Sequence, residues 1–182
     1  MFKKLDILDE KDKRLRLISK DVVFPLSKEE KDLIKQAIKH LTYSQIEEYS
    51  KKYDLRPGMG LAFPQLGINK RVIIIVHEVK ENTFENYVFV NPVIISHSTE
   101  IIAAETGEGC LSVNREVEGH VPRYARITVE GFDENGNKIS VRAREELSIA
   151  FQHEIDHLDG IMFYDRINKN KPFFNENEIR LI

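Results

Sequence analysis

Two histidines and a glutamate in the segment 151–160 have the spacing of a metal site. His153 and His157 lie four residues apart, Glu154 follows the first of them, and Gly160 comes three residues after the second. On a helix, imidazoles four residues apart leave the same face and can bind one metal ion. Glu154 would project about 100° around the helix, beside the ion, where it could take a proton from a water that the metal activates. The spacing therefore predicts a metal site with its own general base.

Two imidazoles leave a further protein ligand to be found. Phe163 stands where one class of zinc proteases carries a third histidine, so that class is excluded. Another class takes a glutamate from a later helix, which makes Glu176 and Glu178 candidates. Pro172 and several asparagines nearby disfavour the helix that such a ligand would need.

The upstream candidate is Cys110, the single cysteine of the chain. A lone cysteine is often a buried apolar side chain, but Gly107 and Gly109 flank this one and allow the backbone to turn tightly. A thiolate with two imidazoles gives three ligands and leaves one position open for water or substrate. We therefore predict Cys110, His153 and His157 as the metal ligands.

The rest of the sequence indicates an α+β fold with largely antiparallel sheets packed around the C-terminal metal-binding helix. A capping box of Ser27 and Glu30 begins a long amphipathic helix, expected over about residues 28–51. Residues 54–70 carry three glycines and two prolines and should form a loop. The β-branched runs 71–76 and 87–97 predict strands, and Asn135-Gly136 predicts a hairpin with a type I′ turn. Helical periodicity returns over 145–159, with Gly160 as its cap.

Composition and charge are those of an ordinary globular protein. The length of 182 residues favours a single catalytic domain over residues 1–182. The net charge of -3 argues against non-specific nucleic-acid binding. No apolar run is long enough to span a bilayer, so we expect no membrane association. The N-terminus lacks the pattern of a secretory signal, and one cysteine excludes an internal disulfide. We expect a cytoplasmic protein.

Three segments together resemble the motifs of the peptide deformylases. They are "GMGLAFPQ" (58–65), "EGCLS" (108–112) and "HEIDHLDG" (153–160), which occur in the family's order. The long segment before the first motif is similar to the class with insertions, common in Gram-positive bacteria and their relatives. The resemblance implies a metal-dependent hydrolase that removes the formyl group from the N-terminal formylmethionine of newly made proteins and releases formate. N-formylmethionyl nascent polypeptides would be its partners, and contact with the ribosome is left open.

The resemblance also implies roles for particular residues. Cys110, His153 and His157 match the metal ligands, with Fe²⁺ as the usual ion and Zn²⁺, Ni²⁺ or Co²⁺ as substitutes. Glu154 matches the general acid/base. The Gln65 side chain and the backbone N–H of Leu111 match the groups that stabilise the oxyanion. Residues matched to substrate binding are Gly58, Met59, Gly60, Leu61, Glu108 and Gly109.

Some side chains have two interpretations. Ile149 and Ala150 precede His153 by four and three residues and could line a methionine pocket or belong to the core. The Gln65 amide could instead bond its own backbone. Phe63 replaces an alanine that the family usually has, and it could fill the core or narrow the cleft. The remaining histidines, His40, His77, His97 and His120, show no ligand spacing and are expected at the surface or in strands.

Two other functions compete with deformylation. A metalloprotease would use Glu176 or Glu178 as the third ligand and leave Cys110 without a role. A non-catalytic binding module would use the metal only as a structural staple.

Overall fold

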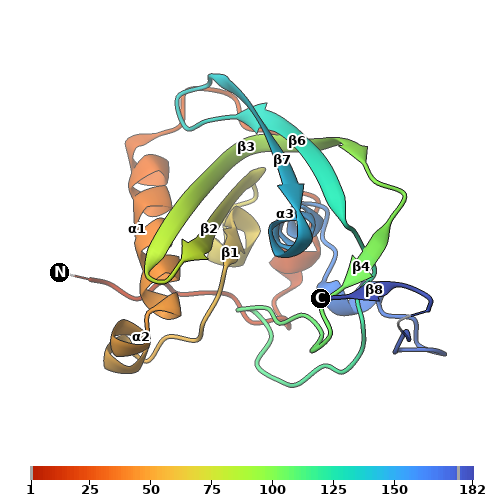
Figure 1. Cartoon of the computed structure of the whole chain (residues 1–182). Helices are drawn as coiled ribbons and strands as arrows, with labels where there is room; N and C mark the ends of the chain where they lie inside the picture. Colours follow the sequence, from red (N-terminus) through yellow and green to blue (C-terminus); the bar gives the residue numbers. More distant parts are fainter. Residues whose placement is uncertain (1, 176) are drawn as a thin grey trace.

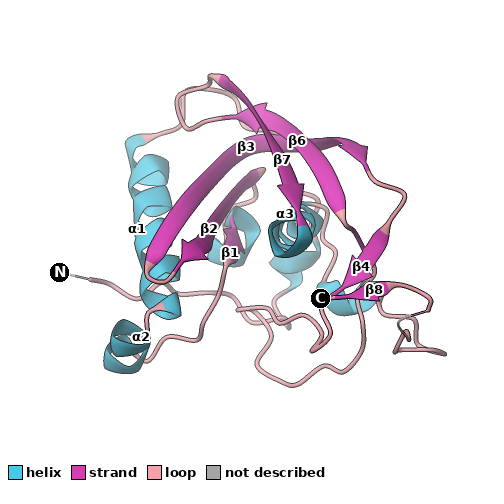
Figure 2. Ribbon diagram, in the orientation of Figure 1, coloured by secondary structure: helices cyan, strands magenta, loops and turns pink. Residues whose placement is uncertain are grey.

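The computed structural model describes residues 2–175 and 177–182, which form an α+β fold with antiparallel sheets (Figures 1 and 2). The α-helices are α1 (Lys28–Gln45), α2 (Glu47–Tyr53) and α3 (Glu145–Leu158), and the 3₁₀ helices are η1 (Lys13–Arg16), η2 (Phe63–Leu66) and η3 (Phe163–Arg166). The strands are β1 (Gly60–Ala62), β2 (Val72–Lys80), β3 (Thr83–His97), β4 (Ile101–Ala103), β5 (Arg123–Tyr124), β6 (Arg126–Phe132), β7 (Lys138–Arg144) and β8 (Arg180–Leu181). None of the helices in the described ranges is long and apolar enough to cross a membrane.

The larger sheet curves around α3. Its five strands are antiparallel in the order β1-β2-β3-β6-β7, and Figure 1 shows α3 inside the curve with α1 on the other side of β2. A smaller sheet has the order β5-β4-β8, in which β4 and β8 run parallel. The sheets are therefore largely antiparallel, as predicted.

Strand β2 is buried on both faces because a helix covers each of them. Ile73 and Ile75 pack into the cluster that contains Phe151 of α3, whereas Ile74 packs into the cluster that contains Leu41 of α1. Side chains alternate between the faces of a strand, so one continuous apolar run serves both clusters. Each such side chain contributes about 1.5–3 kcal/mol when fully buried. This packing fixes α3 against the sheet.

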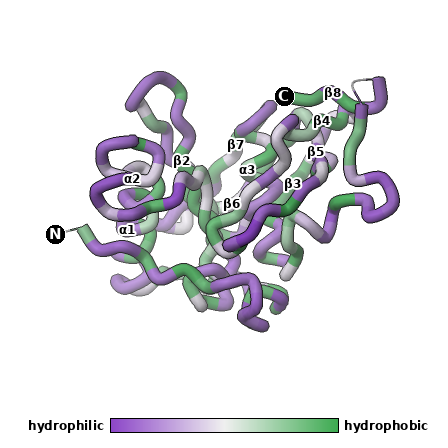
Figure 3. Tube along the Cα trace, turned by 90° about the horizontal axis from the view of Figure 1, so that it is seen from below, coloured by the Kyte–Doolittle hydropathy of each residue, from purple (hydrophilic) through white to green (hydrophobic). Residues whose placement is uncertain are grey.

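The helix expected over residues 28–51 is interrupted. The capping box forms as predicted, but α1 ends at Gln45, and Ile46 is extended (φ -99°, ψ 116°) before α2 begins. In the last turn of α1, the hydroxyls of Thr42 and Ser44 bond to backbone carbonyls three or four residues back. Such bonds compete with the helical pattern. The short second helix is largely hydrophilic (Figure 3).

Three local predictions also need correction. The hairpin joins β6 and β7, but its loop spans residues 133–137, and of the expected pair only Gly136 has a positive φ (86°). A type I′ turn needs a positive φ at both central residues, so that turn type is wrong. The segment 54–70 is not only a loop, since it contains β1 and η2. His40 is neither exposed nor in a strand, because it is buried on the inner side of α1.

Helix α3 lies in the interior. Every residue from Ser148 to Leu158 is buried, and beyond its end Gly160 adopts a positive φ of 71°. The backbone of Arg16 lies against Gly160, so a side chain at position 160 would collide with it. This burial gives the polar residues of α3 fixed surroundings.

Candidate metal centre and peptide cleft

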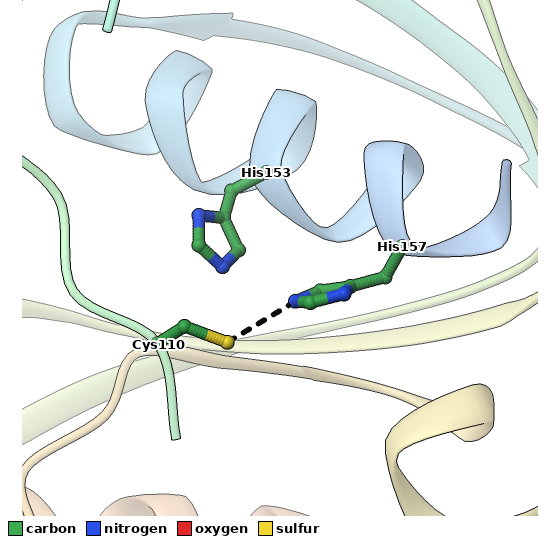
Figure 4. A group of neighbouring side chains, drawn as sticks. All are labelled: Cys110, His153 and His157. Atoms are coloured by element: carbon green, nitrogen blue, oxygen red, sulfur yellow. Dashed lines mark hydrogen bonds between the residues drawn. The ribbon is translucent and has the colours of Figure 1, made fainter. Parts of the chain in front are cut away.

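The three predicted ligands converge on one point. Cys110 comes from the loop after β4, and His153 and His157 come from successive turns of α3 (Figure 4). Their ligand atoms all lie within 4.8 Å of one another, and Cys110 Sγ is 3.3 Å from Nε2 of His157. One sulfur and two imidazole nitrogens suit a first-row ion such as Zn²⁺ or Fe²⁺. The residues present thus fit the metal that the spacing predicts.

The orientation of His153 is fixed from behind by a carboxylate. Nδ1 of His153 lies 2.8 Å from Glu108 Oε2, which leaves Nε2 for an ion. Metal-binding histidines usually use their second nitrogen in this way. Nδ1 of His157 is buried without a hydrogen-bond partner in the described residues, so no hydrogen bond at that nitrogen orients the ring from behind.

A buried ion network supports Glu108. Arg123 donates to Glu108 through Nε (2.7 Å) and Nη2 (2.9 Å), and its Nη1 donates to Asp156 at 2.6 Å. Arg166 completes the network by donating to both oxygens of Asp156. Burial alone would raise the pKa of Glu108, but the hydrogen bonds from Arg123 and His153 outweigh it and lower the pKa to about 2. Glu108 is therefore a fixed negative charge behind the ligands.

The pKa values of the two histidines are shifted in opposite directions. Burial, and then the neighbouring His153, lower the pKa of His157 well below its usual value. Burial acts in the same direction on His153, but hydrogen bonds to Cys110 and Glu108 prevail and raise its pKa well above the usual value. The Cys110–Glu108 side of the site therefore favours a positive charge, which a bound ion would supply in place of a proton.

Glu154 lies beside the ligands, and one of its carboxylate oxygens has no partner in the described residues. The residue is buried, and its Oε2 has no hydrogen-bond partner in the described part of the chain. Burial raises the pKa of Glu154 to about 7. A Cβ at Gly60 would overlap this carboxylate, so the glycine makes room for it. A carboxyl group that titrates near neutrality can both accept and return a proton.

Gln65 makes the local hydrogen bond, and its amide nitrogen faces Cys110. Its Oε1 accepts a hydrogen bond from the Ala62 amide at 2.8 Å, which is the local bond. That bond turns Nε2 toward Ser112 Oγ (3.1 Å) and Cys110 Sγ (3.5 Å). The backbone N–H of Leu111 has no acceptor among the described residues. Both donors lie next to the ligand Cys110, where an oxyanion could be stabilised.

Cys110, His153 and Glu154 line a cleft of about 1300 Å³. Predicted residues that line it are Gly58, Met59, Gly60, Gln65, Glu108, Gly109, Leu111, Ile149 and Ala150. Gly109 has open space where a side chain would be, whereas a Cβ at Gly58 would lie 2.7 Å from a methyl of Leu111. Ile149 and Ala150 each belong to a core cluster and also line the cleft, and the methionine pocket stays a prediction.

Other predicted contacts lie elsewhere. The Leu61 side chain is fully buried in the core between α1 and β2 and does not line the cleft, so a substrate contact at Leu61 stays a prediction for its backbone alone. The Glu108 carboxylate is occupied by Arg123 and His153. Phe63 is also fully buried in that core, which answers the question that its bulk raised.

Of the two alternative carboxylate ligands, Glu178 is bound to other groups. The carboxylate of Glu178 pairs with Lys171 and accepts the Asn175 amide at 3.0 Å. Glu176 lies outside the described residues. Nothing in the described chain therefore favours the glutamate ligand of a metalloprotease.

Several supporting residues were not predicted. Arg56 donates to the carbonyls of Val113 (2.8 Å), Cys110 (2.9 Å) and Leu111 (2.7 Å), which ties the cysteine loop to the first motif. Arg123, Asp156 and Arg166 form the network described above. Arg56 lies two residues before the first motif, and Asp156 lies within the third. Proximity to a motif was the only sign in the sequence of a supporting role for Arg56 and Asp156. Arg123 and Arg166 lie in no motif, and nothing in the sequence indicated their role.

The family model, the related sequences and the solved structures that match this chain are all described as deformylases. The family model described as Polypeptide deformylase matches residues 4–173. "Peptide deformylase 2" of Bacillus anthracis is 48% identical over 168 residues, covering 92% of this chain and 91% of its own. The peptide deformylase of Levilactobacillus brevis is 45% identical over the full length of both chains. Among solved structures, peptide deformylase from Thermus thermophilus matches with a TM-score of 0.75 and 31% identity, covering 91% of this chain and 87% of that one.

Proposed function

The chain belongs to the polypeptide deformylase family, and we propose which of its residues carry out that family's reaction. It is a metal-dependent hydrolase that removes the formyl group from the N-terminal formylmethionine of newly made polypeptides and releases formate. Residues 1–182 act as one catalytic domain in the cytoplasm, where formylated chains are made. The family match over residues 4–173 supports this assignment.

Cys110, His153 and His157 hold the metal, and Fe²⁺ is the ion we assign. The convergence of their ligand atoms within 4.8 Å supports the ligand set. A divalent ion held there would lower the pKa of water and would polarise the formyl carbonyl. Metal analysis of protein purified without oxygen tests the identity of the ion, because a ferrous thiolate site is easily oxidised.

Glu154 moves the proton. Its raised pKa, about 7, lets the carboxylate accept the proton of the attacking water and then return it to the leaving amine. The free Oε2 has no competing partner in the described residues, so it is available for this transfer. The amine leaves as the free N-terminus of the polypeptide, and formate is the second product.

Gln65 and Leu111 stabilise the oxygen that becomes negative when the formyl carbon is attacked. The Gln65 Nε2 group and the Leu111 N–H both lie beside Cys110, and this position supports the role. One preorganised donor of this kind contributes about 3–4 kcal/mol to lowering the barrier. Ile149 and Ala150 line the cleft next to His153 and hold the methionine side chain.

The observation that carries this assignment is the unpartnered, buried carboxylate of Glu154 beside three converging ligands. The test is formate release from formyl-Met-Ala-Ser by protein loaded with Fe²⁺ or Ni²⁺ without oxygen. The wild type should release formate, and Glu154→Gln should be about 10²–10⁴-fold slower with unchanged metal content. No release by the metal-loaded wild type would contradict the assignment and favour a binding module.

A further inference from the structure

Two large apolar side chains from the C-terminal part of the chain stand half exposed in the cleft. Phe173 is 49% exposed and Ile182 is 37% exposed, and both line the cleft that contains the metal ligands. Large apolar side chains that remain in contact with water on the wall of a binding groove commonly mark a contact surface. The other exposed large apolar residues in the described chain, such as Ile95, do not line this cleft.

The wall is fixed to the fold. Strand β8 pairs in parallel with β4, and the pairing continues at Ile182, whose N–H donates to the Ala103 carbonyl at 3.0 Å. The Ile182 carbonyl accepts the Glu105 amide at 2.8 Å. Glu105 precedes the motif that carries Cys110 by three residues. The Ile182 side chain is therefore held at a set position relative to the ligands.

His120 fixes the other half of the wall. It is buried, so the prediction that it is a surface or strand residue is wrong. Its Nδ1 accepts the Phe174 amide at 2.9 Å, and its Nε2 lies 3.2 Å from the Glu105 carbonyl. Because Nδ1 accepts, Nε2 carries the proton and donates it to that carbonyl. The His120 amide also donates to Pro172, and the ring meets Phe173 edge-on at 5.3 Å.

The cleft is larger than a formylmethionine needs. Its volume is about 1300 Å³, while a pocket for a compact small ligand is about 300–1000 Å³. The reacting formyl group is placed by Cys110, His153 and Glu154, and the remaining space extends to Phe173 and Ile182. That space can hold the residues that follow the formylmethionine.

We propose that Phe173 and Ile182 form an apolar wall, positioned by His120, that makes the enzyme prefer polypeptides with an apolar side chain at the third or fourth residue. The proposal rests on the deformylase function stated above. The wall contributes by burying part of that side chain, and the gain appears in KM because the contact is the same before and during the reaction.

Peptide pairs that differ at one position provide the test. kcat/KM is measured for formyl-Met-Ala-Leu against formyl-Met-Ala-Ser, and for the same exchange at position four. The wild type should favour leucine in at least one pair by about 10-fold, the low end of what an apolar contact provides. Phe173→Ser combined with Ile182→Ser should bring the ratio close to one, mainly through KM. Ile95→Ser, a half-exposed isoleucine outside the cleft, should leave it unchanged.

The positioning role of His120 has its own comparison. His120→Ala should reduce the leucine preference, and His120→Gln, which can still accept and donate a hydrogen bond, should restore part of it. Formate release from both peptides of each pair with a ratio near one in the wild type, or a ratio that survives the double substitution, would overturn the wall while leaving the deformylase assignment intact. No formate from any peptide would overturn both.

Discussion

Two buried glutamates on opposite sides of the metal ligands have opposite surroundings. Behind the ligands, Glu108 receives hydrogen bonds from Arg123 and His153, and its pKa is lowered to about 2. In front of them, Glu154 has an unpartnered Oε2, and burial raises its pKa to about 7. The same type of residue thus serves as a fixed charge at position 108 and as a proton carrier at position 154. Partners, rather than burial, make the difference.

The largest effect on metal binding and activity is expected from replacing the ligand Cys110. Cys110→Ala removes the thiolate ligand, so bound metal should fall to background and formate release should be lost. Loss of a direct ligand should exceed the about 10–100-fold effect of losing an outer partner. Metal analysis after dialysis measures it. Full metal retention would instead support a site that does not use Cys110, as the metalloprotease alternative requires.

Gly60→Ala perturbs the Glu154 region alone. The added methyl would overlap the Glu154 carboxylate and push it from its position. We expect kcat to fall about 10²-fold, because small misplacements of a reacting group have effects of that size. Equal kcat values for Gly60→Ala and the wild type would show that the carboxylate does not need this space.

Arg123→Gln perturbs the Glu108 region directly. It removes the main partner of Glu108 and one partner of Asp156, both of them buried. Metal affinity should fall about 10–100-fold, and the free energy of unfolding should fall by about 3–5 kcal/mol. Competition with a chelator and denaturant titration measure the two effects. The exposed Arg142→Gln should change neither, and an unaltered metal affinity in Arg123→Gln would contradict the supporting role.

The smallest effect on the reaction is expected from Phe63→Leu. Phe63 is fully buried in the core and does not line the cleft. The substitution should lower stability by about 1–3 kcal/mol and change KM for formyl-Met-Ala-Ser less than about twofold. A large change in KM with little loss of stability would show that this ring shapes the cleft after all.

Sequence reasoning succeeded where a local pattern determines the outcome. The spacing of His153 and His157 depends only on helical geometry, and the capping box at Ser27 and the apolar run of β2 are equally local. It failed where distant segments meet. Arg123 and Arg166 join Glu108 and Asp156 only after the chain has folded, and no spacing along the sequence indicates those bonds. The burial of Leu61 likewise depends on which strand face meets α1, and the motif alone does not specify that face.

The most direct test of the contrast between the two glutamates measures metal affinity and rate together in Glu154→Gln and Glu108→Gln. We predict that Glu154→Gln keeps metal affinity within about twofold and loses about 10²–10⁴-fold in formate release. Glu108→Gln should lose about 10–100-fold in metal affinity and recover most of its rate at saturating metal. If instead both variants lost the same property to the same extent, the two glutamates would share one role, and the division between fixed charge and proton carrier would be wrong.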